Sequence, residues 1–501
     1  MSARALMVLG TASHVGKSLL TAALGRIFAD EGYRVAPFKA QNMSLNSAAT
    51  PDGREIGRAQ ALQAEACRVP ARAEMNPILL KPSSDTSSQV VVLGRVWGQS
   101  TAADYHQGRV EELFPIVVQS YHALAQEHDI IVIEGAGSPA EINLKVHDIV
   151  NMRMAQAARA NCLLVGDIDR GGVFAALLGT LELLDSCERE LIHAFVVNKF
   201  RGDVKLLEPG LEMISKRIGL PCAGVVHYLA ETGLDEEDSV ALEDRRGFTS
   251  LPAQGMLRIG VLAFPHLANF TDFDALRAEP SVALGFIDRP EDLASLDLLI
   301  LPGSKQTLND LAWLRKRGFE RGILDFHGGA GIAGICGGMQ MLGYSIDDPG
   351  GAESNGAPSC ARGLGILPID TVLEAEKTTR MVRGSAGLGE FHGYEIHLGE
   401  TVYREGAREF ARIRREGDDT SRRDGAIAAT ERAFGSYVHG LFQDDAFRHS
   451  FLAEARRACG LPPVTEWACV SAEREARIDR WANHVRRSLD MRLIHSLVGM
   501  T

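Results

Sequence analysis

The chain has 501 residues, of which 45% are hydrophobic and 24% are charged, and its formal net charge is −12. This length predicts two or three domains, and the composition is that of an ordinary globular protein. The negative charge argues against nucleic acid or an anionic membrane as the main partner. No apolar run approaches the roughly 18 residues that a membrane-spanning helix needs. The N-terminus runs directly into a predicted strand, so we expect no export signal.

Five apolar segments in the first half predict the strands of a parallel sheet. They alternate with helical patterns, and continuous apolar strands separated by helices are typical of a sheet covered on both faces. The predicted strands are 5–10, 34–38, 129–135, 162–169 and 194–199. Residues 1–230 are therefore predicted to form an α/β nucleotide-binding domain.

A glycine loop, GTASHVGKS at 10–18, joins the first predicted strand to a predicted amphipathic helix. Five residues separate Gly10 from Gly16, one more than in the common phosphate-loop pattern. In this setting, backbone N–H groups and the helix dipole attract phosphate oxygens. We predict that Lys17 reaches the outer phosphates and that the Ser18 hydroxyl ligates Mg²⁺. An ordinary turn with a solvated Lys17 is the alternative, but it leaves the whole context of the motif unexplained.

Polar residues at other strand ends are candidates for the same site. Glu134 ends a predicted strand and supplies the hard carboxylate that Mg²⁺ needs. Asp167 and Asp169 also lie at a strand end, where capping of the next helix explains either of them equally well. Asn198 is placed to pair with a nucleobase edge, and Arg201, where guanine-binding chains have Asp, favours ATP over GTP.

The second half begins after an acidic segment, 231–255, that contains Ser, Pro and Gly and predicts a linker. Apolar strands are predicted at 256–264 and 296–303, followed by the glycine-rich segment 331–343. Residues 256–450 are predicted to form a second α/β domain. The less distinctive residues 451–501 are predicted to be a helical extension.

Cys336 lies between glycines after a short apolar run. This pattern predicts a tight strand-to-helix turn that presents the thiol as a nucleophile, by the mechanics of the serine elbow of hydrolases. The helix N-terminus favours the thiolate. The backbone N–H groups of Gly303 and Gly337 are predicted to form an oxyanion hole.

The other seven cysteines are scattered without C-x-x-C pairs. We interpret them as small, mostly buried residues, because cysteine is among the most buried residue types. Neither a zinc site nor a disulfide framework is predicted, and a reducing cytoplasm is expected.

A catalytic thiol needs a base. Among the fifteen histidines, His439 is the best candidate, because it ends an apolar, aromatic run that predicts a strand. His392 and His397 are competitors. A lone histidine is more often structural, and only the strand-end position distinguishes His439.

These motifs resemble known families. GTASHVGKS resembles the wider loop of dethiobiotin synthetase and its relatives, and GICGGMQ with YVHGLF resembles class I glutamine amidotransferase domains. Joined in this order, over residues 3 to 450, they are similar to the cobyrinate amidases. Further stretches favour the member that acts late: FKAQNMSLNS (38–47), MNPILLKP (75–82), EGAGSPAEINL (134–144), DIDRGGVFAAL (167–177), NKFRGD (198–203), EEDSVAL (236–242) and NFTDFDAL (269–276).

The resemblance implies a P-loop synthetase domain followed by a class I glutamine amidotransferase domain of flavodoxin-like α/β fold. It implies that ATP, Mg²⁺ and L-glutamine drive amidation of the four remaining carboxylates (b, d, e and g) of adenosylcobyrinic acid a,c-diamide. An acyl phosphate would activate each carboxylate, and ammonia released at Cys336 with the help of His439 would attack it.

The resemblance also assigns residues, with one departure from the usual pattern. Lys17, Ser18 and Glu134 match the nucleotide and metal positions. The stretches that would face nucleotide and corrinoid carboxylates contribute Lys39, Gln41, Asn42 and Asn76. Many class I amidotransferases have H-P-E, whereas here Gly440 and Leu441 follow the histidine. Orientation of the imidazole is therefore left to Glu395, a backbone carbonyl or nothing, and we predict a dyad with modest glutaminase activity until the synthetase site is occupied.

Three rival functions are weighed against this one. The a,c-diamide synthase of the same pathway has the same two domains but amidates two other carboxylates. The seven further stretches quoted above argue against it. A partitioning or switch ATPase shares the P-loop sheet but does not need the cysteine elbow. A scaffold with a dead glutaminase domain does not need an intact Cys336 and His439.

Overall fold

The computed structural model describes residues 3–83, 87–101, 104–229, 232–234, 255–326, 328–354 and 356–500. The chain divides into two compact units that are not contiguous in sequence. Unit 1 comprises Met1–Ser44, Ile56–Glu237 and Arg474–Thr501, and unit 2 comprises Leu45–Glu55 and Asp238–Glu473. Contiguous boundaries were expected from the sequence, but 45–55 cluster with unit 2 and 474–501 cluster with unit 1. Most of the predicted linker 231–255 lies outside the described residues.

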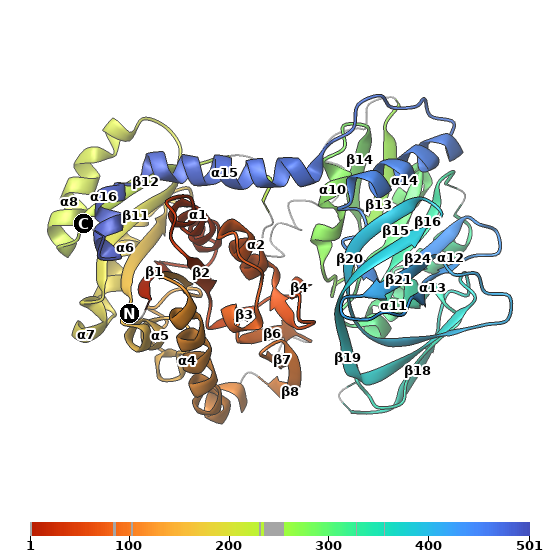
Figure 1. Ribbon diagram of the computed structural model, residues 1–501, viewed down its shortest axis with the longest axis horizontal. Coiled ribbons are helices and arrows are strands. Elements are labelled where there is room, and N and C mark those ends of the chain that lie inside the picture. Colours follow the sequence, from red (N-terminus) through yellow and green to blue (C-terminus); the bar gives the residue numbers. More distant parts are fainter. Residues whose placement is uncertain are drawn as a thin grey trace. The chain divides into compact units, whose positions relative to one another are not determined.

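Unit 1 is built on a six-stranded parallel sheet with the order β12-β11-β10-β1-β9-β2 (Figure 1). The strands are β1 (Arg4–Gly10), β2 (Val35–Phe38), β9 (Ile130–Glu134), β10 (Asn161–Asp167), β11 (Ile192–Phe200) and β12 (Cys222–His227). The helices are α1 (Lys17–Asp30), α2 (Arg58–Ala66), α4 (Val110–Glu127), α5 (Met152–Ala158), α6 (Val173–Glu182), α7 (Ser186–Arg189) and α8 (Glu208–Ile218). All five predicted strands are present, because strands buried on both faces have continuous apolar sequences.

The carboxyl ends of the central strands bring the candidate residues of unit 1 to one edge. Strand β1 lies between β9 and β10, with Val8 beside Glu134 and Gly10 beside Val165. The phosphate loop follows β1, and Glu134 ends β9. Open parallel sheets bind their ligands at this edge, where adjacent chain connections diverge.

A smaller sheet also belongs to unit 1. A four-stranded sheet has the order β3-β6-β7-β8. Its strands are β3 (Gln41–Met43), β6 (Ile78–Pro82), β7 (Ser87–Val92) and β8 (Arg95–Thr101). It follows β2 in the chain and carries the stretches in which substrate contacts were predicted.

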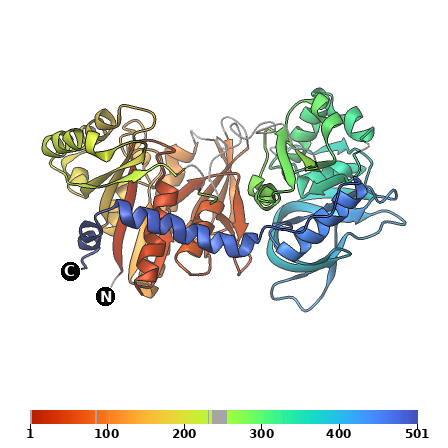
Figure 2. The ribbon, with the colours of Figure 1, turned by 90° about the horizontal axis from the view of Figure 1, so that it is seen from above.

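The C-terminal helices explain why the end of the chain belongs to unit 1. These are α15 (Val470–Ser488) and α16 (Met491–Leu497). Helix α15 crosses α1 (Figures 1 and 2), and its residues Ile478, Trp481 and Val485 share the apolar core of α1. Trp481 Nε1 donates to the Leu19 carbonyl at 2.7 Å. The predicted helical extension is thus part of the nucleotide-binding core.

Unit 2 contains a second α/β sheet with the order β14-β13-β15-β16-β24-β23, parallel except for its last pair. The strands are β13 (Leu257–Leu262), β14 (Val282–Ile287), β15 (Leu298–Leu301), β16 (Gly331–Ile335), β23 (Ala426–Ile427) and β24 (Ala433–Ser436). The helices are α10 (Asp274–Arg277), α11 (Thr307–Lys316), α12 (Phe319–Leu324), α13 (Gly337–Leu342) and α14 (Asp445–Ala458). Both units therefore have the predicted α/β class.

A largely antiparallel sheet packs beside it in one shared apolar core. Its path is β18-β17-β19-β20-β25, with β21 and β22 attached to β19. The strands are β17 (Ser345–Asp348), β18 (Ser359–Arg362), β19 (Ile369–Ala386), β20 (Gly389–Tyr403), β21 (Ala411–Arg415), β22 (Arg422–Asp424) and β25 (Val438–His439). Pairing of β20 with β25 places Tyr394 opposite His439.

Across the part of the chain that the structure describes, no helix combines the length and the apolar character needed to cross a membrane.

Candidate active sites

The phosphate loop of unit 1 needs both of its glycines for steric reasons. Gly16 is the N-cap of α1 with φ 95°, a left-handed conformation that favours glycine. A Cβ at this position would lie 2.3 Å from Asn198 Nδ2, and one at Gly10 would lie 2.7 Å from Val15. The widened loop is therefore closed tightly around its own side chains at the N-terminus of α1, where N–H groups point toward anions.

Glu134 is the centre of a buried polar cluster at this loop. Ser18 Oγ donates to Glu134 Oε1 at 2.7 Å, and Lys39 Nζ donates to the same oxygen at 3.0 Å. The other oxygen accepts from Gln63 Nε2 at 2.6 Å and from Gln60 Nε2 at 3.3 Å. Burial alone would raise the pKa of Glu134, but the Lys39 ammonium and the hydrogen bonds hold it below its usual range. Glu134 is thus kept ionised.

This donor set fits Mg²⁺. Mg²⁺ takes hard oxygen ligands and is usually held by one or two carboxylates together with substrate phosphates. The Ser18 hydroxyl and the ionised Glu134 carboxylate are within hydrogen-bond distance of each other beside the loop. Among the described residues, no group of three or more His, Cys, Asp or Glu could hold a metal by itself.

Lys17 and Asn198 both contact the loop backbone. Lys17 Nζ donates to the carbonyls of Ala12 at 2.9 Å and Gly137 at 3.0 Å, so the ammonium lies over the loop. Asn198 is buried, and its Nδ2 donates to Val15 O at 2.8 Å while its Oδ1 accepts from Lys199 N at 2.9 Å. The amide of Asn198 thus holds the loop, and its predicted contact with a nucleobase stays a prediction.

Asp167 and Asp169 pair with basic side chains from the end of β11. Lys199 Nζ lies 2.9 Å from Asp167, and Arg201 Nε lies 3.0 Å from Asp169. Helix α6 has Gly172 as its N-cap and no side-chain cap. Neither carboxylate therefore caps that helix.

The four predicted substrate contacts have different surroundings. Lys39 is buried and pairs with Glu134. Asn42 and Asn76 are buried and hydrogen-bonded within unit 1, to Gln60 and to the carbonyls of Lys39 and Ile78 respectively. Gln41 lines a cavity of about 220 Å³, whose wall also includes the segment after β9. Of the four predicted contacts, only Gln41 is among the residues that line this cavity.

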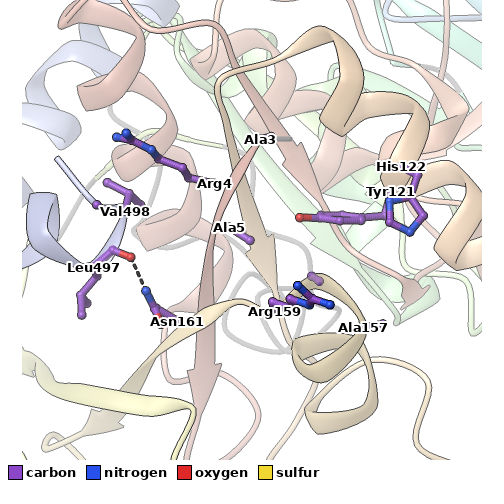
Figure 3. A pocket seen from close by; sticks show the side chains of 12 residues that line it. Ala3, Arg4, Ala5, Tyr121, His122, Ala157, Arg159, Asn161, Leu497 and Val498 are labelled. Carbon is purple, nitrogen blue, oxygen red and sulfur yellow. Dashed lines mark hydrogen bonds between the residues drawn. The ribbon is translucent and has the colours of Figure 1, made fainter. Parts of the chain in front are cut away.

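A larger cavity of about 660 Å³ lies elsewhere in unit 1 (Figure 3). Its lining includes Arg4 and Asn161, the first residues of β1 and β10, together with Leu497 at the end of α16. Asn161 donates to the Leu497 carbonyl across it. Because it opens at the amino ends of the strands, it lies at the opposite edge from the phosphate loop and shares no residue with the candidate site.

In unit 2, Cys336 lies on a strained elbow between β16 and α13. Its φ is 50° and its ψ is −111°, a conformation that non-glycine residues rarely adopt and that is found at functional turns. The surrounding glycines are needed because the turn is crowded: a Cβ at Gly338 would lie 1.9 Å from Leu301 O. Cys336 is buried, and its Sγ lies 3.6 Å from the Ile396 carbonyl. The geometry is that of a nucleophile elbow.

Gly303 lies beside both catalytic candidates. A Cβ on Gly303 would lie 3.0 Å from His439 Cε1 and 3.8 Å from Cys336 Cβ. Gly337 is the first residue of α13, directly after the cysteine. The two predicted oxyanion-hole residues thus both lie beside Cys336.

His439 is held by a carboxylate that was not predicted. His439 Nδ1 lies 2.6 Å from Asp272 Oδ2, and Asp272 Oδ1 accepts from Gly440 N at 3.0 Å. Asp272 belongs to the 3-10 turn η5 (Phe270–Phe273), and both side chains are almost fully buried. Because Nδ1 faces Asp272, Nε2 is the nitrogen directed to the thiol. The predicted dyad is corrected to a Cys–His–Asp arrangement.

The surroundings of His439, above all the Asp272 carboxylate, raise the pKa of His439 to about 10. Burial alone would lower it, but the charge of Asp272, followed by Cys336, outweighs burial. At neutral pH the imidazole is therefore protonated and can act as an acid toward a leaving amine.

The competing groups are engaged elsewhere. His392 is exposed and faces Asp444. His397 stacks on Tyr437 at 3.8 Å and contacts Glu395. Arg415 Nε donates to Glu395 at 2.6 Å, and although burial would raise the pKa of Glu395, His397 and Arg415 lower it to about 2. Glu395 therefore pairs with His397 and Arg415, and it does not take the place beside His439 Nδ1 that Asp272 occupies.

Three residues of the two candidate sites have no signal in the sequence: Asp272, Gln60 and Gln63. Asp272 lies in the stretch NFTDFDAL, which was singled out only for its resemblance. It is 167 residues from His439 in the chain, so no spacing rule connects them. Gln60 and Gln63 lie on α2, where a polar face predicts only solvent exposure.

Comparisons with known proteins agree with this geometry. Residues 6–239 match the family described as the CobQ/CobB/MinD/ParA nucleotide binding domain, and residues 258–447 match the CobB/CobQ-like glutamine amidotransferase domain. The structure of PurLQS from Thermotoga maritima is 16% identical over 39% of this chain with a TM-score of 0.27, a likeness too weak to support an argument. Fold, elbow and family matches together define a nucleotide-binding glutamine amidotransferase.

Curated relatives define the family more narrowly. Cobyric acid synthase of Sorangium cellulosum is 49% identical over 100% of this chain and 99% of its own length. The enzymes of Moorella thermoacetica and Salmonella typhimurium are 47% and 45% identical over 99% of this chain and 98% of their own length. The chain belongs to the cobyric acid synthase family, which confirms the predicted resemblance to the cobyrinate amidases.

Proposed function

We propose that this chain amidates the four remaining peripheral carboxylates (b, d, e and g) of adenosylcobyrinic acid a,c-diamide to give adenosylcobyric acid. Each amidation consumes one ATP and one glutamine. The observation that carries the proposal is the presence, in one chain, of a phosphate loop with an ionised carboxylate and of a buried Cys–His–Asp set. The first suits carboxylate activation and the second suits release of ammonia.

The residues of unit 1 activate the carboxylate. A carboxylate is a poor electrophile, because it is anionic and its leaving group is oxide. Transfer of the γ-phosphoryl group of ATP to it gives an acyl phosphate, whose leaving group is phosphate. Lys17 and the loop N–H groups stabilise the charge of that transfer. Mg²⁺, held by Ser18 and Glu134, supplies further charge neutralisation when bound.

The residues of unit 2 release the amine. With its proton held by His439, Cys336 attacks the amide carbon of glutamine as the thiolate, and the protonated His439 donates its proton to the departing ammonia. The resulting thioester is hydrolysed by a water from which the now neutral His439 takes a proton, so glutamate leaves and Cys336 is regenerated. The backbone N–H groups of Gly303 and Gly337 stabilise the oxyanion. Ammonia then attacks the acyl phosphate and displaces phosphate.

Mass spectrometry tests the proposal directly. The protein is incubated with ATP, Mg²⁺, glutamine and adenosylcobyrinic acid a,c-diamide. We expect four successive changes of about one mass unit each, since every step replaces OH by NH₂. No change would refute the proposal. Two changes on unamidated cobyrinic acid would instead favour an a,c-diamide synthase.

A matched variant separates the two half-reactions. Cys336→Ser removes the nucleophile, so glutamine-dependent amidation is expected to stop while ammonium chloride still supports it. Loss of both activities would show that Cys336 supports the structure and not only the chemistry.

A further inference from the structure

A short hairpin in unit 2 comes from the first half of the sequence. Residues 45–55 lie in the chain between β3 and α2, which belong to unit 1. They contain β4 (Ser47–Ala49) and the start of β5 (Glu55–Gly57), which pair with each other. Thr50 N donates to Arg54 O at 2.7 Å and closes the turn. We call residues 45–55 the hairpin.

A buried ion pair connects the hairpin to strand β19 of unit 2. Lys377 Nζ, on β19, lies 2.6 Å from Glu55 Oε2, and Ser47 Oγ donates to Glu55 Oε1 at 2.7 Å. The side chains of Lys377 and Glu55 are 9% and 1% exposed. Removing one partner of such a pair leaves an uncompensated buried charge, so the pair fixes where the hairpin lies on β19.

The hairpin supports the side chain that stacks on the catalytic imidazole. Tyr394 OH donates to the Ser47 carbonyl at 3.2 Å. The ring of Tyr394 is stacked on His439, with centroids 5.4 Å apart and planes 21° apart. The tyrosine is therefore held on one side by the hairpin and contacts the general acid on the other.

Two more contacts reach the residues behind the catalytic groups. Ala49 packs with Ile396 and Tyr394, and the Ile396 carbonyl lies 3.6 Å from Cys336 Sγ. Ser47 N donates to Asn269 Oδ1 at 2.9 Å. Asn269 has φ 56° and begins the turn η5, which carries Asp272. Each member of the Cys–His–Asp set thus has a neighbour that the hairpin contacts.

The residues on either side of the hairpin are connected by hydrogen bonds to Glu134 in unit 1. Asn42 Nδ2, just before the hairpin, donates to Gln60 Oε1 at 3.0 Å, just after it. Gln60 in turn donates to Glu134 at 3.3 Å. Lys39 and Gln60 each donate to a Glu134 oxygen. If Ser18 and Glu134 held a cation, these two donors would have to share the carboxylate with it, so occupation of the site would change the hydrogen bonding at the base of this segment.

We propose that the hairpin is a positioning element of the glutaminase site, and that the segment 43–59 links the occupancy of the Glu134 site to glutamine hydrolysis. Ser47 and Ala49 act through Tyr394, Ile396 and Asn269. The coupling half of this inference rests on the proposed function. The positioning half concerns glutamine hydrolysis alone.

Tyr394→Phe tests the positioning role in the full chain. It removes the hydroxyl that reaches Ser47 and retains the ring that stacks on His439. Loss of one hydrogen bond corresponds to a decrease of about threefold to tenfold in kcat for glutamine hydrolysis without ATP. KM for glutamine is expected to be unchanged, because the ring does not leave its place. The matched control is Tyr403→Phe, the same change on the same strand β20 but away from the hairpin.

A second variant strengthens the test. Asn269→Gly removes the acceptor of the hydrogen bond from Ser47 N, and glycine accepts the left-handed backbone of this position. The double variant, which combines Tyr394→Phe with Asn269→Gly, is expected to lose the stimulation of glutamine hydrolysis by ATP, Mg²⁺ and corrinoid. Amidation driven by ammonium chloride should stay at the wild-type rate.

The outcomes are distinguishable. A double variant with wild-type basal hydrolysis and wild-type stimulation would overturn the inference. So would a parallel loss of ammonium-driven amidation, because the effect would not be confined to the glutaminase site. If the wild type amidates no corrinoid with either nitrogen source, the proposed function fails, whereas comparison of Tyr394→Phe with Tyr403→Phe still decides the positioning role.

Discussion

Replacement of Asp272 by asparagine removes the charge beside His439 and retains the side-chain shape. Asp272 accepts from His439 Nδ1 at 2.6 Å and from Gly440 N at 3.0 Å. An amide has one acceptor oxygen, so it can satisfy only one of these donors. If the amide nitrogen faces the ring, the proton of the neutral imidazole moves to Nε2, the nitrogen that Cys336 needs as an acceptor.

The structure sets the size of the effect. A pKa of about 10 for His439, against about 6.5 for an ordinary histidine, corresponds to roughly 5 kcal/mol of preference for the imidazolium. Burial opposes this preference, and Asp272 is the largest contribution in its favour. Without the carboxylate we expect the pKa of His439 to fall by several units. A wrong tautomer or a lost imidazolium reduces kcat by about 10² to 10⁴.

The assay is glutamate release without ATP or corrinoid, followed from pH 6 to pH 10.5. The wild type should lose activity only as His439 deprotonates near pH 10, whereas the alkaline limb of Asp272→Asn should move toward neutral pH. Since the folded-state pKa is raised, the stabilisation from this histidine is complete below about pH 6.5 and is lost as pH rises through about 10. The deficit in Tm of the variant should therefore be largest near pH 6 and small near pH 10.

The control is His392→Gln, which changes an exposed histidine that also faces an aspartate. Its pH profile should match the wild type. If Asp272→Asn keeps kcat within about threefold of the wild type with the same alkaline limb, the carboxylate does not position the imidazole and the reasoning is refuted.

Three further predictions concern other parts of the molecule. Glu134→Gln should reduce amidation by about 10² or more with either nitrogen source, measured by product mass, while unstimulated glutamine hydrolysis persists; equal losses of both would contradict separate sites. Gly338→Ala should cost about 3 kcal/mol or more in urea unfolding, because its Cβ would lie 1.9 Å from Leu301 O, whereas Gly350→Ala meets nothing within 4 Å and should be neutral. Burial raises the pKa of Asp424 to about 7. As the pH rises from 4 to 7, the wild type should therefore lose up to about 1.4 kcal/mol of stability per pH unit relative to Asp424→Asn. Parallel curves of Tm against pH for the two proteins would exclude this effect of Asp424.

Much of the fold of unit 1 was readable from the sequence. Five of its six central strands are buried apolar runs, and their pattern predicted them. Strand β12 was missed because Gly224 interrupts it. That glycine has φ 149°, and a Cβ there would lie 2.1 Å from Ser488 O, so its presence reflects packing against the end of α15. A contact with a residue so distant in the chain has no local signal.

The sequence by itself determined the two local motifs. A phosphate loop and a nucleophile elbow are built from consecutive residues, and backbone sterics with helix-end N–H groups dictate which residues can form them. The local sequence is therefore sufficient to place Gly16 and Cys336 on their turns.

Only the tertiary structure decided what surrounds those motifs. Asp272 pairs with His439, which is 167 residues away in the chain, and Lys39 pairs with Glu134, which is 95 residues away. Residues 45–55 cluster with unit 2, whose other residues begin at Asp238. The physical reason is that a buried charge needs a partner of opposite charge, but the partner is whichever group the packing of distant elements brings within reach.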